Sequence, residues 1–478
     1  MSSEPIREHL QAILQPYGQE HILRFWDRLT PAQQEHLAAQ IGAIDWANVE
    51  HWIQQALSGA CESVDFGKLT PAPYVSIHPT DAAGRARLAE GRAAGEALLR
   101  QGKVAAFTVA GGQGTRLGYD GPKGTYAFSA LRHKTLFQYF AESLLNNRRK
   151  YAAAIPWYIM TSPANNAATV AFFQEHGFFG LPPEDVKFFI QGTLPGFGQD
   201  GRALMEAPDS LALFANGHGG TLAALRDSGT LDDMARRGVD YLSYFQVDNP
   251  LISVCDPLFI GLHHLSGSEM SSRALIKRDA KEKLGHFCDY EGHLTVVEYS
   301  DMPDSLTSLK DADGQLTFRA GSPAMHVINR TFVDRLTAGR LALTPHRANK
   351  KIACLDEAGR LVKPDSPNGI KLEFFIFDAL PMARKTLILE VDRVEQFAPI
   401  KNAAGADSAE SCRAALAERT ARWLEAAGVK VPRKADGTPE AQIEISLLKA
   451  NCAEDVAKLV AEGAIPAVIT AGATLAID

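Results

Sequence analysis

Short apolar runs alternate with amphipathic segments through the middle of the chain. Four runs have the length and composition of buried strands: 104–109, 157–161, 186–191 and 241–247. Helical periodicity separates several of them, at 135–148, 164–175 and 220–237. Buried strands that alternate with amphipathic helices predict an α/β fold with a largely parallel sheet, covered by helices on both faces.

The pattern differs on either side of this region. Residues 1–57 show helical periodicity, an extended stretch with three prolines follows, and another helix is predicted near 80–101. Beyond about residue 270, paired apolar segments predict hairpins that turn at Glu291-Gly292 and Ala358-Gly359. The last predicted elements are a helix near 370–384, a strand at 386–391 and a helix at 408–427.

These changes in pattern divide the chain into three expected parts. We expect a mostly helical N-terminal region at 1–95, an α/β core at 96–402 and a small C-terminal α/β domain at 403–478. The sequence contains neither an internal repeat nor a low-complexity tract.

Composition narrows the class of protein and of partner. With 46% hydrophobic and 22% charged residues, the chain has the balance of a soluble globular protein, and its net charge of −7 argues against nucleic acid or an anionic membrane as partner. The N-terminus is charged, and no apolar run approaches the roughly 18 residues of a membrane helix. The six cysteines form no CxxC pair, so we expect neither a disulfide framework nor a zinc site, and a cytoplasmic location.

One glycine-rich stretch carries the strongest chemical signal. VAAFTVAGGQGTRLGYDGPKGTY, residues 104–126, runs from an apolar strand into a loop with four glycines in eight residues. Glycines let backbone N–H groups approach a phosphate closely. Arg116 adds a planar fork that suits phosphate oxygens, and Lys123 follows Pro122, which stiffens the backbone before it.

Two common phosphate-binding signatures do not fit this loop. A P-loop requires a glycine directly before a lysine that is followed by Ser or Thr, and the loop has no such triplet. The dinucleotide pattern G-x-G-x-x-G starts at Gly112 and Gly114 but meets Leu117, and the next glycine is Gly118. The spacing therefore counts against an NAD-dependent oxidoreductase. Two cations beside a triphosphate suit the stabilisation of a leaving pyrophosphate.

The loop and six further segments resemble the eukaryotic-type UDP-sugar pyrophosphorylases, most closely the UDP-N-acetylglucosamine pyrophosphorylases. The matching segments, in order, are AGGQGTRLG with PKGTY, HKTLFQ (133–138), FFIQGTLP (188–195), QVDNPL (246–251), VVEYS (296–300), KPDSPNGIKLEFFIFD (363–378) and PIKNAAG (399–405). The resemblance implies a GT-A/Rossmann-like nucleotidyltransferase core with a mixed sheet. It also implies a uridylyltransferase that uses UTP and a sugar 1-phosphate.

The resemblance assigns the phosphate chemistry to four residues. Arg116 and Lys123 would hold the triphosphate, and Lys401 would contact the sugar phosphate. Asp248 follows the apolar strand 241–247, at the carboxyl end where open α/β sheets bind ligands. A single carboxylate there suits Mg²⁺, which also takes phosphate oxygens and waters as ligands.

The resemblance also implies a nucleotide-binding set and a sugar-binding set. Besides Asp248, the nucleotide would be met by Gly111, Gly112, Gln191 and Gly217. The sugar would be met by His218, Gly285, Glu298 and Phe375.

Two positions depart from the N-acetylglucosamine pattern. His218 and Met325 stand where those enzymes usually carry asparagine, and both positions would belong to the sugar pocket. N-acetylglucosamine 1-phosphate is therefore expected as substrate, with glucose 1-phosphate or a broad sugar range as the alternative. A non-catalytic nucleotide-sugar-binding protein is the alternative from another class. It predicts the loss of at least one of the four phosphate-chemistry residues, and all four are present.

Overall fold

The computed structural model describes residues 3–58 and 64–478, so Cys61 lies outside the described part. The chain divides into two compact units. Unit 1 consists of residues 1–67, 191–224 and 336–379, and unit 2 of residues 68–190, 225–335 and 380–478. These units cut the chain at positions other than the expected 95/96 and 402/403 boundaries, and the three-part division stays a prediction.

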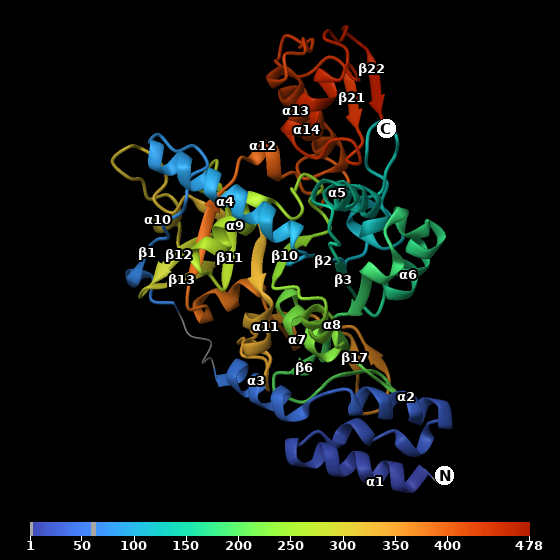
Figure 1. Ribbon diagram of the computed structural model, residues 1–478. Coiled ribbons are helices and arrows are strands. Elements are labelled where there is room, and N and C mark those ends of the chain that lie inside the picture. The colour runs from blue at the N-terminus through green and yellow to red at the C-terminus, as the bar shows by residue number, and fades with distance from the viewer. Residues whose placement is uncertain (1–2, 59–63) are drawn as a thin grey trace. The chain divides into compact units, whose positions relative to one another are not determined.

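Unit 2 is built on an 11-stranded sheet (Figure 1). Its parallel part has the order β10-β2-β3-β4, and the members are β2 (Val104–Val109), β3 (Trp157–Thr161), β4 (Val186–Ile190) and β10 (Tyr241–Gln246). All four runs predicted from the apolar pattern are confirmed as strands. β3 is buried along its whole length, and β2 along all but its last residue, as expected for strands covered on both faces.

The sheet continues beyond β10 with mainly antiparallel strands, so it is mixed, as the resemblance implied, and less parallel than the alternating pattern suggested. The order from the far edge is β1-β12-β14-β11-β15-β10, with β13 paired to β12 and β20 paired to β11. The strands are β1 (Leu69–Pro71), β11 (Met270–Ile276), β12 (Gly285–Tyr290), β13 (His293–Val297), β14 (Ala320–Ser322), β15 (His326–Asn329) and β20 (Thr386–Glu390). The predicted turn at Glu291-Gly292 is confirmed, because both residues have positive φ, as a two-residue hairpin requires.

Helices cover this sheet. They are α4 (Ala82–Arg100), α5 (Leu136–Tyr151), α6 (Asn166–Glu175), α8 (Thr230–Arg236) and α9 (Pro257–Ser266), with short α10 (Asp304–Thr307) and α12 (Arg393–Gln396). α4 and α9 lie side by side because Gly91 and Gly95 of α4 meet Gly261 of α9 backbone to backbone. α7 (Thr221–Asp227) and α11 (Arg330–Leu336) span the boundaries between the units.

The C-terminal part of unit 2 has its own small core. It contains α13 (Ala409–Ala426), α14 (Ala453–Ala461) and the parallel pair β21 (Gln442–Ile445) and β22 (Thr474–Ile477), drawn in orange-red and red in Figure 1. Buried residues between Leu424 and Ile469 pack together there, separately from the main core. The predicted helix at 408–427 is confirmed.

Unit 1 joins the N-terminal helices to two later segments. The helices are α1 (Ser3–Leu14), α2 (Pro31–Gly42) and α3 (Trp46–Ser58), which confirms the helical N-terminal pattern. Its strands are β5 (Thr193–Pro195), β6 (Phe197–Gly198), β7 (Met205–Ala207), β8 (Ser210–Leu211), β9 (Leu213–Ala215), β16 (His346–Lys350), β17 (Cys354–Leu355), β18 (Leu361–Val362) and β19 (Gly369–Glu373). β17 and β18 confirm the predicted hairpin around Ala358-Gly359.

The predicted helix near 370–384 is wrong in its first half. Residues 369–373 form β19, which pairs with β16 on one side and β6 on the other. Ile370 and Leu372 are buried while Lys371 and Glu373 alternate with them, a period of two that the helical interpretation overlooked. Only a 3₁₀ segment, Ile376–Met382, follows it.

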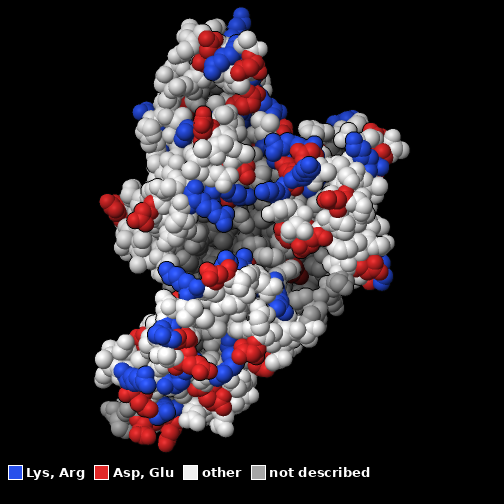
Figure 2. All heavy atoms as spheres, turned by 180° about the vertical axis from the view of Figure 1, so that it is seen from behind, with Lys and Arg blue, Asp and Glu red and all other residues white. Residues whose placement is uncertain are grey.

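The distribution of charged side chains on the surface agrees with the nearly equal numbers of acidic and basic residues in the chain. Acidic and basic side chains are interspersed over the face shown in Figure 2. Within residues 3–58 and 64–478, no helix has both the length and the apolar character needed to cross a bilayer.

Candidate functional site

The glycine loop leaves the carboxyl end of β2 and is closed by its own backbone. Gly114 N–H donates to the Gly121 carbonyl at 2.9 Å, and Lys123 N–H donates to the Gly112 carbonyl at 3.0 Å. A side chain built at Gly112 would meet no atom within 4 Å, so this backbone is open to a ligand. Arg116 lies in a 3₁₀ turn, Thr115–Leu117, and its side chain is exposed.

A buried amide that the sequence analysis did not single out holds this loop. Asn165 Nδ2 donates to the carbonyls of Ala110 (2.9 Å) and Gly112 (3.3 Å), and Asn165 Oδ1 accepts from Ser162 N–H at 2.8 Å. Asn165 thereby joins the loop after β2 to the loop after β3. The SPANN sequence is the only local signal for it, because an Asn before a helix is usually read as a cap.

Lys123 and Asp248 meet at the carboxyl edge of the parallel strands. β10 lies beside β2 in parallel register, and Gln246 of β10 is paired with Val109 of β2. The residues that follow the two strands therefore emerge at the same edge. Lys123 Nζ lies 3.2 Å from Asp248 Oδ2, and each side chain is only 14% exposed. The predicted cation and the predicted metal-binding carboxylate are thus brought into direct contact.

Lys401 belongs to the same region of unit 2. Ile400 N–H donates to the Asp248 carbonyl at 2.8 Å. The neighbouring Asn249 is buried, and its side chain donates to the Gln396 carbonyl (2.8 Å) and accepts from Ala398 N–H (3.0 Å). These three bonds tie the segment that carries Lys401 to the end of β10. Asn249 lies in the quoted QVDNPL segment, but its bracing role was not foreseen.

Gly285 and Glu298 are brought together at the hairpin of unit 2. Gly285 begins β12, and Glu298 follows β13, its hairpin partner. A Cβ at Gly285 would lie 3.4 Å from Glu298 Oε1 and 2.7 Å from the Val296 side chain. A larger residue at 285 would therefore clash with Val296, next to the carboxylate that is predicted to bind sugar hydroxyls.

Unit 1 assembles the other predicted residues around Gly217. Gln191 Nε2 donates to the Gly217 carbonyl at 2.7 Å, which fixes the orientation of this buried amide. Gly217 has φ +82°, and a Cβ there would lie 2.4 Å from the Phe374 carbonyl oxygen. Glycine is required at this position on both grounds.

His218 is held in one tautomer. Its Nδ1 accepts a hydrogen bond from Ile376 N–H at 3.1 Å, so in the neutral ring the proton is on Nε2. Burial lowers the pKa of His218 to about 4. The ring stacks on Phe375 with centroids 5.3 Å apart, and Phe375 also contacts the ring of His346 at 4.4 Å. His218 therefore offers a neutral N–H donor at neutral pH.

Met325, the second position that departs from the N-acetylglucosamine pattern, is a buried residue. The side chain is buried in the main hydrophobic core of unit 2, where a thioether packs as an apolar group. Core packing therefore accommodates a methionine at position 325, and its place in the sugar pocket stays a prediction.

Asp248, at the carboxyl edge of the parallel strands, does not belong to a closed metal site made by the described residues. Among residues 3–58 and 64–478, no group of three or more His, Cys, Asp and Glu side chains could enclose a metal. Asp248 by itself matches Mg²⁺, which is commonly held by one or two carboxylates together with phosphate oxygens and waters.

Comparison with known proteins agrees with this geometry. Residues 50–440 match the family model described as UTP--glucose-1-phosphate uridylyltransferase. A human protein, UDP-N-acetylhexosamine pyrophosphorylase-like protein 1, is 37% identical over 445 residues, which cover 90% of this chain and 87% of the human one. UDP-N-acetylglucosamine pyrophosphorylase of Saccharomyces cerevisiae is 37% identical, with 87% of this chain and 90% of the yeast protein covered.

Solved structures show the same fold. UDP-N-acetylglucosamine pyrophosphorylase from Trypanosoma brucei, solved with an inhibitor, matches with a TM-score of 0.84 and 25% identity over 100% of this chain and 98% of the other. A structure described as a putative UDP-N-acetylglucosamine pyrophosphorylase from Entamoeba histolytica matches with a TM-score of 0.73 and 29% identity, over 86% and 98% of the two chains. The chain belongs to the UTP--glucose-1-phosphate uridylyltransferase family.

Proposed function

We propose that this protein joins UTP and N-acetylglucosamine 1-phosphate to form UDP-N-acetylglucosamine and pyrophosphate. Family membership supports a uridylyltransferase, and the names of the human, yeast and trypanosomal relatives support the amino sugar. The observation that carries the proposal is the Lys123–Asp248 pair beside the glycine loop, at the carboxyl edge of the parallel strands.

The reaction requires that the two substrates are aligned and that their negative charge is neutralised. An oxygen of the sugar phosphate attacks the α-phosphorus of UTP, a new P–O bond forms, and the bond to pyrophosphate breaks. No covalent bond to the protein is needed, so catalysis depends on alignment and on the neutralisation of negative charge.

Lys123 and Asp248 compensate each other before the substrate binds. At 3.2 Å and with little exposure, each would otherwise be a poorly solvated charge. When UTP binds, the Lys123 ammonium group would donate to its phosphate oxygens instead, and Asp248 would be free to hold Mg²⁺. The ion would supply positive charge next to the phosphates.

Two further cations complete the phosphate chemistry in this proposal. Arg116 projects from the short turn of the glycine loop and is exposed, so it can fold onto the triphosphate as a bidentate donor. Lys401 binds the phosphate of the sugar substrate with its positive charge. Asn249 and the Asp248 carbonyl hold the backbone segment of Lys401 next to the end of β10.

The remaining assignments follow family positions. By family position, unit 2 offers Gly111 and Gly112 for the uridine part and Gly285 and Glu298 for the sugar. Unit 1 offers Gln191 and Gly217 for the uridine part and His218 and Phe375 for the sugar. Gln191 is held by its bond to Gly217, and Glu298 lies against Gly285. Gln191 therefore has the defined orientation that a specific binding group needs.

A broad sugar range, with glucose 1-phosphate included, is favoured by one observation. The Nε2–H of His218 donates equally well to an acetamido carbonyl and to a hydroxyl oxygen. An asparagine would add an acceptor for the acetamido N–H. We therefore expect incomplete rejection of glucose 1-phosphate, alongside the preference for the amino sugar that the names of the relatives support.

Pyrophosphate release from UTP across a panel of sugar 1-phosphates tests this proposal. The panel contains N-acetylglucosamine, N-acetylgalactosamine, glucose and galactose 1-phosphates, with a reaction without sugar as control. We expect the highest kcat/KM for N-acetylglucosamine 1-phosphate, with glucose 1-phosphate within about a hundredfold. Binding of UTP without turnover on any sugar would support the non-catalytic alternative instead.

A further inference from the structure

The segment after Lys123 forms a short hairpin in unit 2. Phe128 N–H donates to the Lys134 carbonyl at 2.9 Å, and Leu136 N–H donates to the Tyr126 carbonyl at 3.2 Å. The turn that carries Lys123 leads directly into this hairpin and is packed onto Phe137 in the first turn of α5, which follows the hairpin, because a Cβ at Gly124 would lie 2.2 Å from the Phe137 ring. A displacement of the hairpin would therefore move Lys123.

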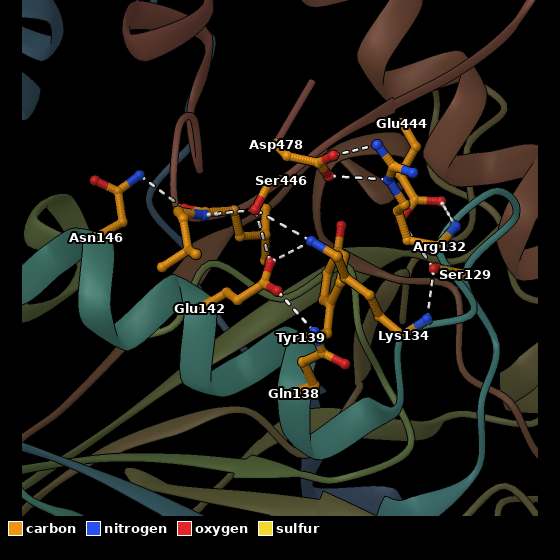
Figure 3. A network of polar contacts seen from close by, with 12 residues as sticks. Ser129, Arg132, Lys134, Gln138, Tyr139, Glu142, Asn146, Glu444, Ser446 and Asp478 are labelled. Atoms are coloured by element: carbon orange, nitrogen blue, oxygen red, sulfur yellow. Dashed lines mark hydrogen bonds and ion pairs between the residues drawn. The ribbon is translucent and has the colours of Figure 1, made fainter. Parts of the chain in front are cut away.

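The tip of the hairpin is bound by one carboxylate from the C-terminal part of the unit. Glu444 Oε2 accepts from Leu131 N–H at 2.7 Å and Arg132 N–H at 3.2 Å, and Glu444 Oε1 accepts from Ser129 Oγ at 2.9 Å. Figure 3 shows Glu444 above Ser129 and Arg132. Next to these residues, His133 has φ +51°, a conformation that only surrounding contacts maintain in a non-glycine residue.

A second contact fixes the lower part of the hairpin to the same C-terminal segment. Lys134 Nζ lies 2.6 Å from Glu142 Oε2 and 3.1 Å from Ser446 Oγ, and Ser446 donates to Glu142 at 2.9 Å. All three residues are buried (Figure 3). Because Ser446 follows the strand β21 that carries Glu444, both contacts come from one rigid element with its own hydrophobic core.

We propose that Glu444 is a positioning residue for Lys123: it acts through the Ser129–His133 tip and gives the C-terminal part of unit 2 a role in substrate binding. This inference depends on the proposed function, in which Lys123 binds the triphosphate. Without the carboxylate, two backbone N–H groups and one hydroxyl lose their acceptor. The tip then leaves its strained conformation, and the hairpin no longer holds the Lys123 turn at its distance from Asp248.

Steady-state kinetics of Glu444→Ala, Glu444→Gln and Glu444→Asp in the full chain test the inference. We expect Glu444→Ala to lower kcat/KM for UTP about tenfold, with the KM for the sugar phosphate within twofold, because Lys401 is held by another segment. Glu444→Gln keeps one carbonyl oxygen that can accept from both N–H groups, so its loss should be smaller than that of Glu444→Ala. Glu444→Asp keeps the acceptor and should recover part of the loss.

Arg132→Ala is the matched control. It removes the ion pair between the same tip and Asp478 but leaves the Arg132 N–H bond to Glu444, so kcat/KM for UTP should stay within twofold. If Glu444→Ala does not fold, Ser129→Ala removes one of the three bonds to Glu444, together with the bond that Ser129 Oγ accepts from Lys134 N–H within the hairpin, and a twofold to fourfold loss specific to UTP is expected.

A lower melting temperature with unchanged kcat/KM for UTP would overturn the positioning role and leave a structural one. Equal losses for both substrates would also overturn it. Hydrogen exchange separates this inference from the proposed function if the wild type shows no turnover. Glu444→Ala should then speed exchange at residues 123–126 as well as at 129–133, and an effect confined to 129–133 would refute the connection to Lys123.

Discussion

Replacement of Asp248 by asparagine removes the negative partner of Lys123 while nearly preserving the shape of the side chain. At the observed separation of 3.2 Å and an effective dielectric constant of about 20, the Coulomb attraction of the pair is about 5 kcal/mol. Much of this is offset by the desolvation of two groups that are 14% exposed. We expect the free energy of unfolding to fall by about 1–3 kcal/mol in the absence of substrate.

The effect of the same change on catalysis should be larger. In the proposed mechanism Asp248 holds Mg²⁺ next to the phosphates, and the ion contributes several kcal/mol to transition-state stabilisation. A loss of about 3–5 kcal/mol corresponds to a decrease in kcat of roughly two hundred- to five-thousand-fold. Because the remaining amide is a weaker ligand for a hard cation, the magnesium concentration at half-maximal rate should also rise.

Pyrophosphate release measured over a magnesium titration, together with urea denaturation, gives both quantities. Asp240→Asn is the matched control: it makes the same change in net charge at the surface pair with Lys103, whose members are 46% and 36% exposed. Such pairs contribute little, so activity within twofold and a stability change below about 0.5 kcal/mol are expected. Near wild-type turnover of Asp248→Asn with unchanged magnesium dependence would refute the assignment.

The remaining predictions concern the other cations, the sugar and the buried histidines. Lys123→Ala should lower kcat/KM mainly for UTP and Lys401→Ala mainly for the sugar phosphate, each by roughly tenfold to a thousandfold, and identical effects on one substrate would contradict the roles given to them. His218→Asn should shift the ratio of kcat/KM toward N-acetylglucosamine 1-phosphate over glucose 1-phosphate, and a ratio that does not move would show that this residue does not set specificity. Burial lowers the pKa of His218, His263 and His286 to about 4, whereas each titrates near 6.5 when unfolded. The unfolded chain therefore binds more protons than the folded chain below pH 6.5. As the pH is lowered from 6.5 to 5, the free energy of unfolding should fall by up to about 1.4 kcal/mol per histidine and pH unit. Urea midpoints that stay constant over this range would contradict this prediction.

The local pattern of apolar and turn residues was sufficient to predict several strands and one hairpin. The strands 104–109, 157–161 and 241–246 have apolar runs bounded by turn residues, and each is confirmed. The hairpin at Glu291-Gly292 is also confirmed, because a glycine-containing two-residue turn specifies its own geometry. The segments quoted for the family resemblance include Lys123, Asp248 and Lys401, and unit 2 brings these residues to one edge of its sheet.

Other features depend on partners that are distant in sequence. Residues 369–373 form a strand because β16 and β6 offer it hydrogen bonds on both sides, and that outweighs the helical interpretation of the segment. Met325 is a core residue because of what surrounds it, not because of its neighbours in the motif.

The sequence by itself determined the family, the order of the strands along the chain and the identity of the charged residues. Only the tertiary structure decided which buried polar groups hold the segments with these charged residues in place. Asn165, Asn249 and Glu444 act through hydrogen bonds to segments 53, 149 and 313 residues away, among them the Gly112, Ala398 and Leu131 backbones. A buried backbone donor or acceptor needs a partner wherever the fold supplies one, and neither composition nor periodicity records which side chain that is.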